Sequence, residues 1–178
     1  VQFWINCKLH KGVVFSQYEK NAKNLSLHFR LGDKGKVDLG FYGNDLATKD
    51  GVVTSGAWHN LTFVMDVSKK TRKTYVNGEE KASDKPATLY AAKTGDTIIG
   101  GWNRVDKGVK KAYQKYIGKV DEVRVWSRVL SQDEITASIG KASLGTSTPV
   151  DSAGKITTIW GMLKSCLLYT SPSPRDLS

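Results

Sequence analysis

The most constraining feature of this 178-residue chain is a repeated alternation of apolar and polar residues, in short segments separated by turn residues. Over residues 25–31 the alternation is complete, with Leu and Phe on one face and Ser, His and Arg on the other. The pattern returns over residues 37–42 after a Gly-containing turn, and again over residues 61–65. Strands with one apolar face predict antiparallel sheets packed face to face around a single core.

Two local signals add detail to this prediction. The dipeptide Asn77-Gly78 after an apolar segment indicates a tight hairpin turn. Residues 120–126 nearly alternate and predict a late strand, and Ser131 with Glu134 forms a capping box that starts a helix at Gln132. Gly140 stands where a helix C-cap glycine is expected.

The order of motifs resembles one known family. Residues 116–135 are similar to the closing strand and trailing helix of LamG-like jellyroll domains, in the concanavalin A-like lectin/glucanase superfamily. Residues 57–66, 74–79 and 98–102 resemble that family's W-H strand, Y-V-N-G hairpin and I-G-G turn. The resemblance implies an all-β fold: an antiparallel two-sheet jellyroll sandwich with one short C-terminal helix, spanning residues 1–140.

The apolar faces of the strands predict which side chains form the core between the sheets. These are Leu27, Phe29, Leu39, Phe41, Leu61, Phe63, Val123 and Val125.

We expect the chain to begin within the sandwich and to continue beyond it at the C-terminus. The resemblance implies a strand before Val1, so we expect the sandwich to be truncated at its N-terminus. Residues 141–164 are rich in small polar residues and predict a linker or the start of a further segment. Residues 165–178 resemble a translated sequencing adapter and are set aside. Cys7 is then a free thiol within this chain, because the other cysteine lies in that tail.

The acidic and histidine residues argue against catalysis. Retaining glycosidases need two carboxyl groups about 5 Å apart, but neighbouring Asp121 and Glu122 point to opposite faces of a strand. The three histidines lie on separate segments without a nucleophile motif. We therefore predict a protein that is not an enzyme. The resemblance implies a calcium ion near the sandwich rim, with Asp121 as one ligand; the alternative is a structural role for Asp121.

Residues 102–116 form a long connection that combines aromatic, amide and basic side chains, as carbohydrate sites on loops do. The candidate ligand-binding residues are Trp102, Asn103, Arg104, Lys110, Lys111 and Tyr113. The alternative is that Trp102 packs at the rim, because the two glycines before it permit close backbone approach.

The formal net charge of +10 indicates attraction to acidic polymers. Residues 69–73 form a basic hairpin and residues 107–119 a second basic cluster. Sulfated or uronic polysaccharides and anionic lipid surfaces suit this charge, whereas nucleic acid is disfavoured because no nucleic-acid-binding module is visible. The alternative is that lysines at a hairpin tip keep strand edges soluble.

These observations predict a non-catalytic module that binds carbohydrate, in particular acidic polysaccharide, within a larger extracellular or cell-surface protein. A protein–protein adhesion module and an accessory domain of a glycan-active enzyme remain open alternatives. The extracellular location follows from the resemblance, and the sequons at Asn24 and Asn60 are compatible with it. No apolar segment approaches the roughly 20 residues that span a bilayer.

Overall fold

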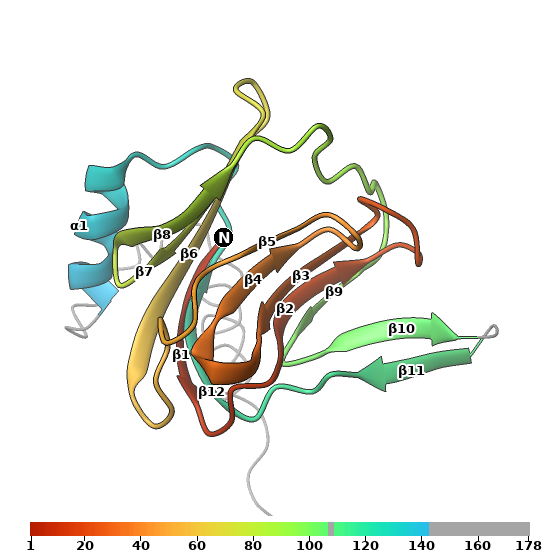
Figure 1. Ribbon diagram of the computed structural model, residues 1–178, viewed down its shortest axis with the longest axis horizontal. Helices are drawn as coiled ribbons and strands as arrows, with labels where there is room; N and C mark the ends of the chain where they lie inside the picture. Colours follow the sequence, from red (N-terminus) through yellow and green to blue (C-terminus); the bar gives the residue numbers. More distant parts are fainter. Residues whose placement is uncertain (107–108, 143–178) are drawn as a thin grey trace, which may run out of the picture. The chain divides into compact units, whose positions relative to one another are not determined.

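The computed structural model describes residues 1–106 and 109–142, and the side chains of residues 1–103 and 114–139 (Figure 1). Its elements form two antiparallel five-stranded sheets, a separate hairpin and one helix. The two-sheet sandwich and the helix confirm the sequence-based prediction. The predicted linker and adapter segments, residues 141–164 and 165–178, lie almost wholly outside the described residues. The first sheet has the order β12-β1-β6-β7-β8. Its strands are Gly118–Arg124, Gln2–Cys7, Trp58–Asp66, Thr71–Val76 and Glu79–Asp84.

The second sheet has the order β5-β4-β3-β2-β9. Its strands are Asp45–Ala47, Val37–Gly40, Ser26–Leu31, Gly12–Tyr18 and Asp96–Ile99. A short 3-10 turn, η1 (Asp33–Gly35), connects β3 to β4. Strands β10 (Trp102–Asp106) and β11 (Val109–Tyr113) pair with each other as a hairpin that extends away from the sheets (Figure 1). The connection expected over residues 102–116 is therefore largely a paired hairpin.

The core lies between the inner faces of the two sheets, and aromatic rings join them. Phe29 of β3 stacks on Phe63 of β6 with ring centroids 4.1 Å apart, and Phe3 of β1 packs against both. Of the predicted core residues, Phe29, Leu39, Phe41, Leu61 and Phe63 are buried, while Leu27 and Val123 are partly buried against the same cluster.

The prediction for Val125 is wrong, because its side chain is 69% exposed. A β-bulge places both Glu122 and Val123 opposite Phe3, and pairing with β1 ends at Arg124. Val125 lies beyond this last paired residue, so the sheet no longer directs its side chain into the core.

Helix α1 (Gln132–Ala142) starts at the predicted residue and continues past Gly140, so the predicted stop at Gly140 is wrong. The capping box is confirmed. The Ser131 hydroxyl accepts from the Glu134 N–H at 3.2 Å, and the Glu134 carboxylate accepts from the Ser131 N–H at 2.8 Å. Ile135 then packs with Leu130 against Val64 and Tyr75, which fixes the helix on the outer face of the first sheet.

The capping box should make helix docking sensitive to acid. The Arg128 guanidinium and the Ser131 N–H lower the pKa of Glu134 from 4.5 to about 2. A depressed pKa in the folded state gives stability that is present above the ordinary value and lost as the pH falls through the folded one. We expect Glu134→Gln to lower the melting temperature near neutral pH, with the difference from wild type shrinking between pH 4.5 and about 2. Asp133→Asn, in the same turn, is the control; a pH-independent difference would contradict the prediction.

Candidate functional site

His28 lies on the outer face of the second sheet, opposite a residue that has no side chain. Its register partner is Gly40, where an added Cβ atom would collide with the imidazole. Trp102 stacks on the ring at a centroid distance of 5.2 Å, so His28 is only 3% exposed. Among the described residues, neither ring nitrogen has a hydrogen-bond partner. Oδ2 of Asp45 lies 3.7 Å from Nε2, beyond hydrogen-bond distance.

Trp102 is positioned by the two glycines before it. Gly100 adopts a φ of +86°, and the Gly101 carbonyl accepts a hydrogen bond from the Ser16 hydroxyl at 2.8 Å. The indole is 5% exposed and meets the rings of Tyr18 and Tyr42 edge-on, with centroids 6.3 and 6.2 Å away. Trp102 is therefore a packing residue at the base of the hairpin, and it also forms one wall of a pocket.

This outer-face pocket has a volume of about 240 Å³. It is bounded by aromatic rings, a guanidinium, a carboxylate and an amide, which is the mixture that sugar sites use. Its lining residues are His28, Arg30, Tyr42, Gly43, Asp45, Trp102 and Gln114.

The charges in and beside the pocket are largely paired. Arg30 donates through Nε and Nη2 to Oδ2 of the buried Asp38, at 3.0 and 2.7 Å. Asp45 accepts the Phe41 N–H at 3.1 Å and places its other oxygen 3.7 Å from Nε2 of His28. Burial raises the pKa of Asp45, but the His28 ring, the Phe41 N–H and Arg30 together outweigh this and lower it below its ordinary value. Asp45 is therefore an ionised acceptor at neutral pH.

Tyr42 carries backbone strain at the pocket wall. It has a φ of +65°, and Gly43 after it has a φ of +73°. The left-handed region is costly for a bulky residue, by roughly 1–2 kcal/mol, and such strain concentrates at functional sites. An aromatic ring is thus held beside Trp102 at a position where glycine or asparagine would fit with less strain.

The predicted ligand-binding residues all lie in the β10–β11 hairpin. The backbone register pairs Trp102 with Tyr113, Asn103 with Ala112 and Arg104 with Lys111. Lys110 pairs with Val105. The side chains of Arg104, Lys110, Lys111 and Tyr113 lie outside the described part, so their binding role stays a prediction. The sequence did not identify the other side chains that line the pocket, which are His28, Arg30, Tyr42, Asp45 and Gln114. One signal was available: His28 and Arg30 face outward from β3, and the neighbouring strand β4 contains Gly40 opposite His28.

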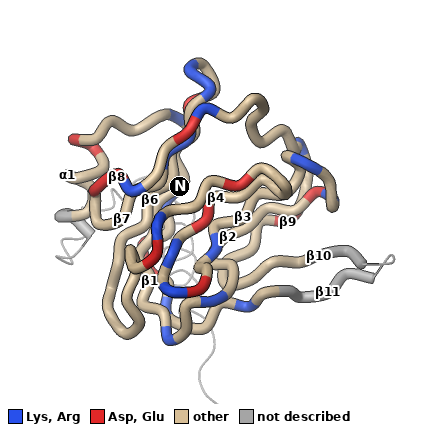
Figure 2. Tube along the Cα trace, in the orientation of Figure 1, with Lys and Arg blue, Asp and Glu red and all other residues tan. Residues whose placement is uncertain are grey.

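The basic hairpin at residues 69–73 presents less charge than its sequence indicates. Arg72 is 2% exposed and lies inside the sandwich, so its assignment to this surface is wrong. Lys73 pairs with Glu80 at 2.8 Å and Lys69 lies 3.9 Å from Asp66. Figure 2 shows basic and acidic positions interspersed along the described strands.

Asp121, the predicted calcium ligand, is exposed on β12. Its Oδ1 accepts the N–H of the next residue, Glu122, at 2.8 Å, a hydrogen bond within the same strand. Among the described residues, no three His, Cys, Asp or Glu side chains gather as a metal site. Calcium binding at Asp121 therefore stays a prediction.

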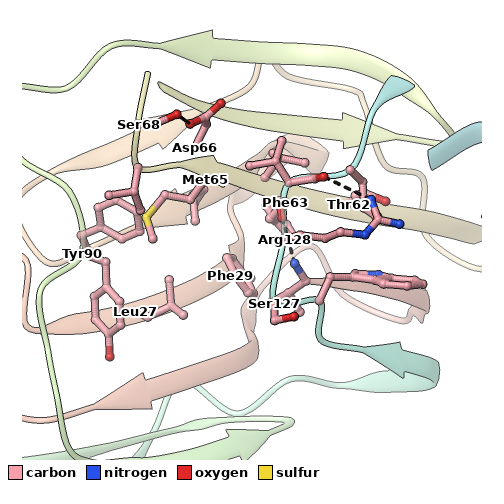
Figure 3. A pocket seen from close by; sticks show the side chains of 18 residues that line it. Leu27, Phe29, Thr62, Phe63, Met65, Asp66, Ser68, Tyr90, Ser127 and Arg128 are labelled. Carbon is pink, nitrogen blue, oxygen red and sulfur yellow. Dashed lines mark hydrogen bonds between the residues drawn. The ribbon is translucent and has the colours of Figure 1, made fainter. Parts of the chain in front are cut away.

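A larger cavity of about 500 Å³ lies between the two sheets (Figure 3). Leu27, Phe29, Phe63 and Met65 form much of its wall, and Asp66 is hydrogen-bonded to Ser68 near its margin. Exposed apolar side chains surround the opening: Val67, Trp126 and Val129. The lining also includes the polar side chains of Thr62, Asp66, Ser68, Tyr90, Ser127 and Arg128. We take the outer-face pocket as the candidate sugar site because there polar side chains lie directly against the rings of Trp102 and Tyr42.

The two sequons differ in their surroundings. Asn60 is buried, and its Oδ1 accepts hydrogen bonds from Thr62 and Gln2, so a glycan at this position is incompatible with the packing. Asn24 is half-buried and donates to Thr88 at 2.7 Å. Within residues 1–106 and 109–142, no helix has the length and apolar character needed to cross a membrane.

Several solved structures share this fold. The chain is 18% identical to the CBM40 module of the Ruminococcus gnavus sialidase, described as bound to α2,3-sialyllactose, with a TM-score of 0.60 over 78% of this chain and 80% of that one. It is 17% identical to a leech intramolecular trans-sialidase, with a TM-score of 0.63, covering 82% of this chain and 23% of that one. It is 16% identical to a pentraxin of Limulus polyphemus, with a TM-score of 0.59, covering 78% of this chain and 67% of that one.

At these identities the structures show a common fold. No curated protein matches the chain in sequence. A family model described as "Concanavalin A-like lectin/glucanases superfamily" matches residues 1–136, which is most of the chain and all of both sheets. This chain therefore belongs to the concanavalin A-like lectin/glucanases superfamily.

Proposed function

We propose that this chain is a non-catalytic carbohydrate-binding module of a larger extracellular protein, and that the sugar binds in the outer-face pocket. The observation that carries the proposal is the pocket itself, in which the aromatic rings of Trp102 and Tyr42 lie beside the polar side chains of His28, Arg30, Asp45 and Gln114. Aromatic walls pack against the faces of sugar rings, and the polar groups between them can bind hydroxyls. The likeness to a sialidase carbohydrate-binding module supports the same class of ligand.

Tyr42→Asn tests the site without unfolding it. Asparagine adopts the left-handed backbone readily, so stability should be preserved while the aromatic wall is lost. After a glycan array identifies ligands, we expect this variant to bind them about tenfold more weakly, the equivalent of about 1.4 kcal/mol. Isothermal titration calorimetry measures the affinity, and thermal unfolding checks the fold.

Trp58→Ala is the matched control, because Trp58 is a 43% exposed aromatic residue on the other sheet. Its replacement should leave glycan affinity unchanged. If Trp58→Ala weakened binding and Tyr42→Asn did not, the outer-face pocket would be excluded as the site. An array without any glycan ligand would contradict the proposed function.

Protein–protein adhesion is the second candidate, and a different observation favours it. The lining of the larger cavity includes three exposed apolar residues, Val67, Trp126 and Val129. Apolar surface of this kind is typical of protein contacts. Pull-down experiments with a charged variant, Val67→Glu with Val129→Glu, should lose partners under this alternative while glycan binding persists under the first.

A further inference from the structure

The outer-face pocket contains an ionised acceptor, the carboxylate of Asp45, whose side chain is 34% exposed. Oδ2 of Asp45 lies 3.7 Å from Nε2 of His28, beyond hydrogen-bond distance, and Oε1 of Gln114, also in the lining, has no hydrogen-bond partner among the described residues. The imidazole adds one further acceptor in its neutral form. These oxygens can accept hydrogen bonds from sugar hydroxyls, whereas the ionised carboxylate or sulfate group of an acidic sugar cannot donate to them.

The charges of the side chains around the pocket also favour a neutral ligand, and this is a separate argument. Near the pocket, one guanidinium, that of Arg30, accompanies two carboxylates, those of Asp38 and Asp45. Arg30 donates two hydrogen bonds to Asp38, through Nε and Nη2, so its positive charge is already paired. If His28 is neutral, these side chains carry net negative charge; if His28 is protonated, they are neutral. In neither state do the described side chains here sum to the positive charge that an anionic sugar needs.

We infer that the outer-face pocket selects a neutral, hydroxyl-rich sugar ring and discriminates against acidic sugars; this inference rests on the proposed function. The sugar would donate hydroxyl hydrogens to Asp45 and Gln114 and accept from His28 or from Arg30, while one ring face packs on Tyr42. The inference departs from the acidic polysaccharide that the net charge of the whole chain favours, because that charge lies outside the described walls of this pocket.

Asp45→Asn tests the inference through the direction of its effect. The amide keeps an oxygen for the Phe41 N–H, so the loop after β4 should be retained, while the ionised acceptor is lost. For a neutral ligand this removes a charged acceptor and weakens binding, by tenfold or more. For an acidic ligand it removes a repulsive charge and strengthens binding.

The probes are neutral galactose, glucose and mannose oligosaccharides, their uronic-acid counterparts of equal length, and sulfated forms, measured by calorimetry at low and high salt. Asp50→Asn is the control, because Asp50 is exposed, lies outside the pocket lining and changes the net charge equally. We expect neutral probes to bind more tightly, with little salt dependence, and only Asp45→Asn to weaken them.

Tighter binding of the acidic probes, weakened by salt and strengthened by Asp45→Asn, would overturn the inference while leaving carbohydrate binding intact. Binding of neutral probes that Asp45→Asn leaves unchanged would also overturn it. The absence of binding to any probe or array glycan would overturn the proposed function itself, and this inference with it.

Discussion

Replacing Phe63 by alanine should lower the free energy of unfolding by about 3–5 kcal/mol, the usual range for truncating a buried phenylalanine. Phe63 is buried and contacts the opposite sheet through the stacked ring of Phe29, at 4.1 Å, and its own sheet through Phe3 at 5.7 Å. The substitution removes the ring that joins the two sheets. The space it leaves would enlarge the cavity that Phe63 already lines, so neighbouring side chains would gain few compensating contacts.

Urea denaturation of wild type and variant measures this difference, from the midpoint and the slope. Val67→Ala is the control on the strand-end surface beside the same cavity, because Val67 is already 67% exposed. Its effect should stay within about 0.5 kcal/mol. A loss below about 1 kcal/mol for Phe63→Ala would contradict the aromatic core that joins the sheets.

Replacing Arg72 by alanine should have the second large effect, a loss of about 3 kcal/mol. The guanidinium is inside the sandwich, where Nε and Nη2 donate to both oxygens of Asp84 at 2.8 and 2.9 Å. The guanidinium donates two more hydrogen bonds to Asn44, one to its backbone carbonyl and one to its side-chain oxygen. The guanidinium carbon also lies 4.9 Å from the ring centroid of Phe41. Breaking a buried pair costs about 3–5 kcal/mol, and the partial exposure of Asp84 places this case near the lower limit.

A double variant separates the pair from the packing. Arg72→Met with Asp84→Asn keeps much of the volume and leaves no unpaired charge, so we expect it to be more stable than Arg72→Ala. Lys70→Ala, in the same hairpin but exposed, should change stability by no more than about 0.5 kcal/mol. Equal effects of Arg72→Ala and Lys70→Ala would show that Arg72 is not a buried link between the sheets.

The strands and the start of the helix could be read from the sequence because local rules govern them. Alternation placed Phe29 and Leu39 in the core, and Asn77-Gly78 forms its turn with φ values of +51° and +83°. The capping box located the first residue of α1 correctly. Each of these features depends on the few residues next to it, and so a single sequence contains the necessary information.

The candidate site depended on contacts between distant segments. Period-2 alternation correctly placed His28 on the polar face, but alternation alone predicted an exposed histidine. Its burial requires Trp102, which lies 74 residues further along the chain, to stack on the imidazole, and it requires Gly40 to leave space for the ring. The sequence predicted binding residues in the β10–β11 hairpin, of which Trp102 lines the pocket. The other pocket walls come mainly from β3, from the turn after β4 and from Gln114.

The sequence by itself determined the family, the two-sheet sandwich and most of the core, because apolar periodicity and turn residues specify strands and their inner faces. Tertiary structure alone decided that Arg72 is a buried ion-pair partner, that Val125 lies past the last paired residue, and that His28 faces a pocket. The physical reason is that burial of a polar or terminal strand residue depends on what another segment places over it. That neighbour is set by sheet order and register, which no local pattern encodes.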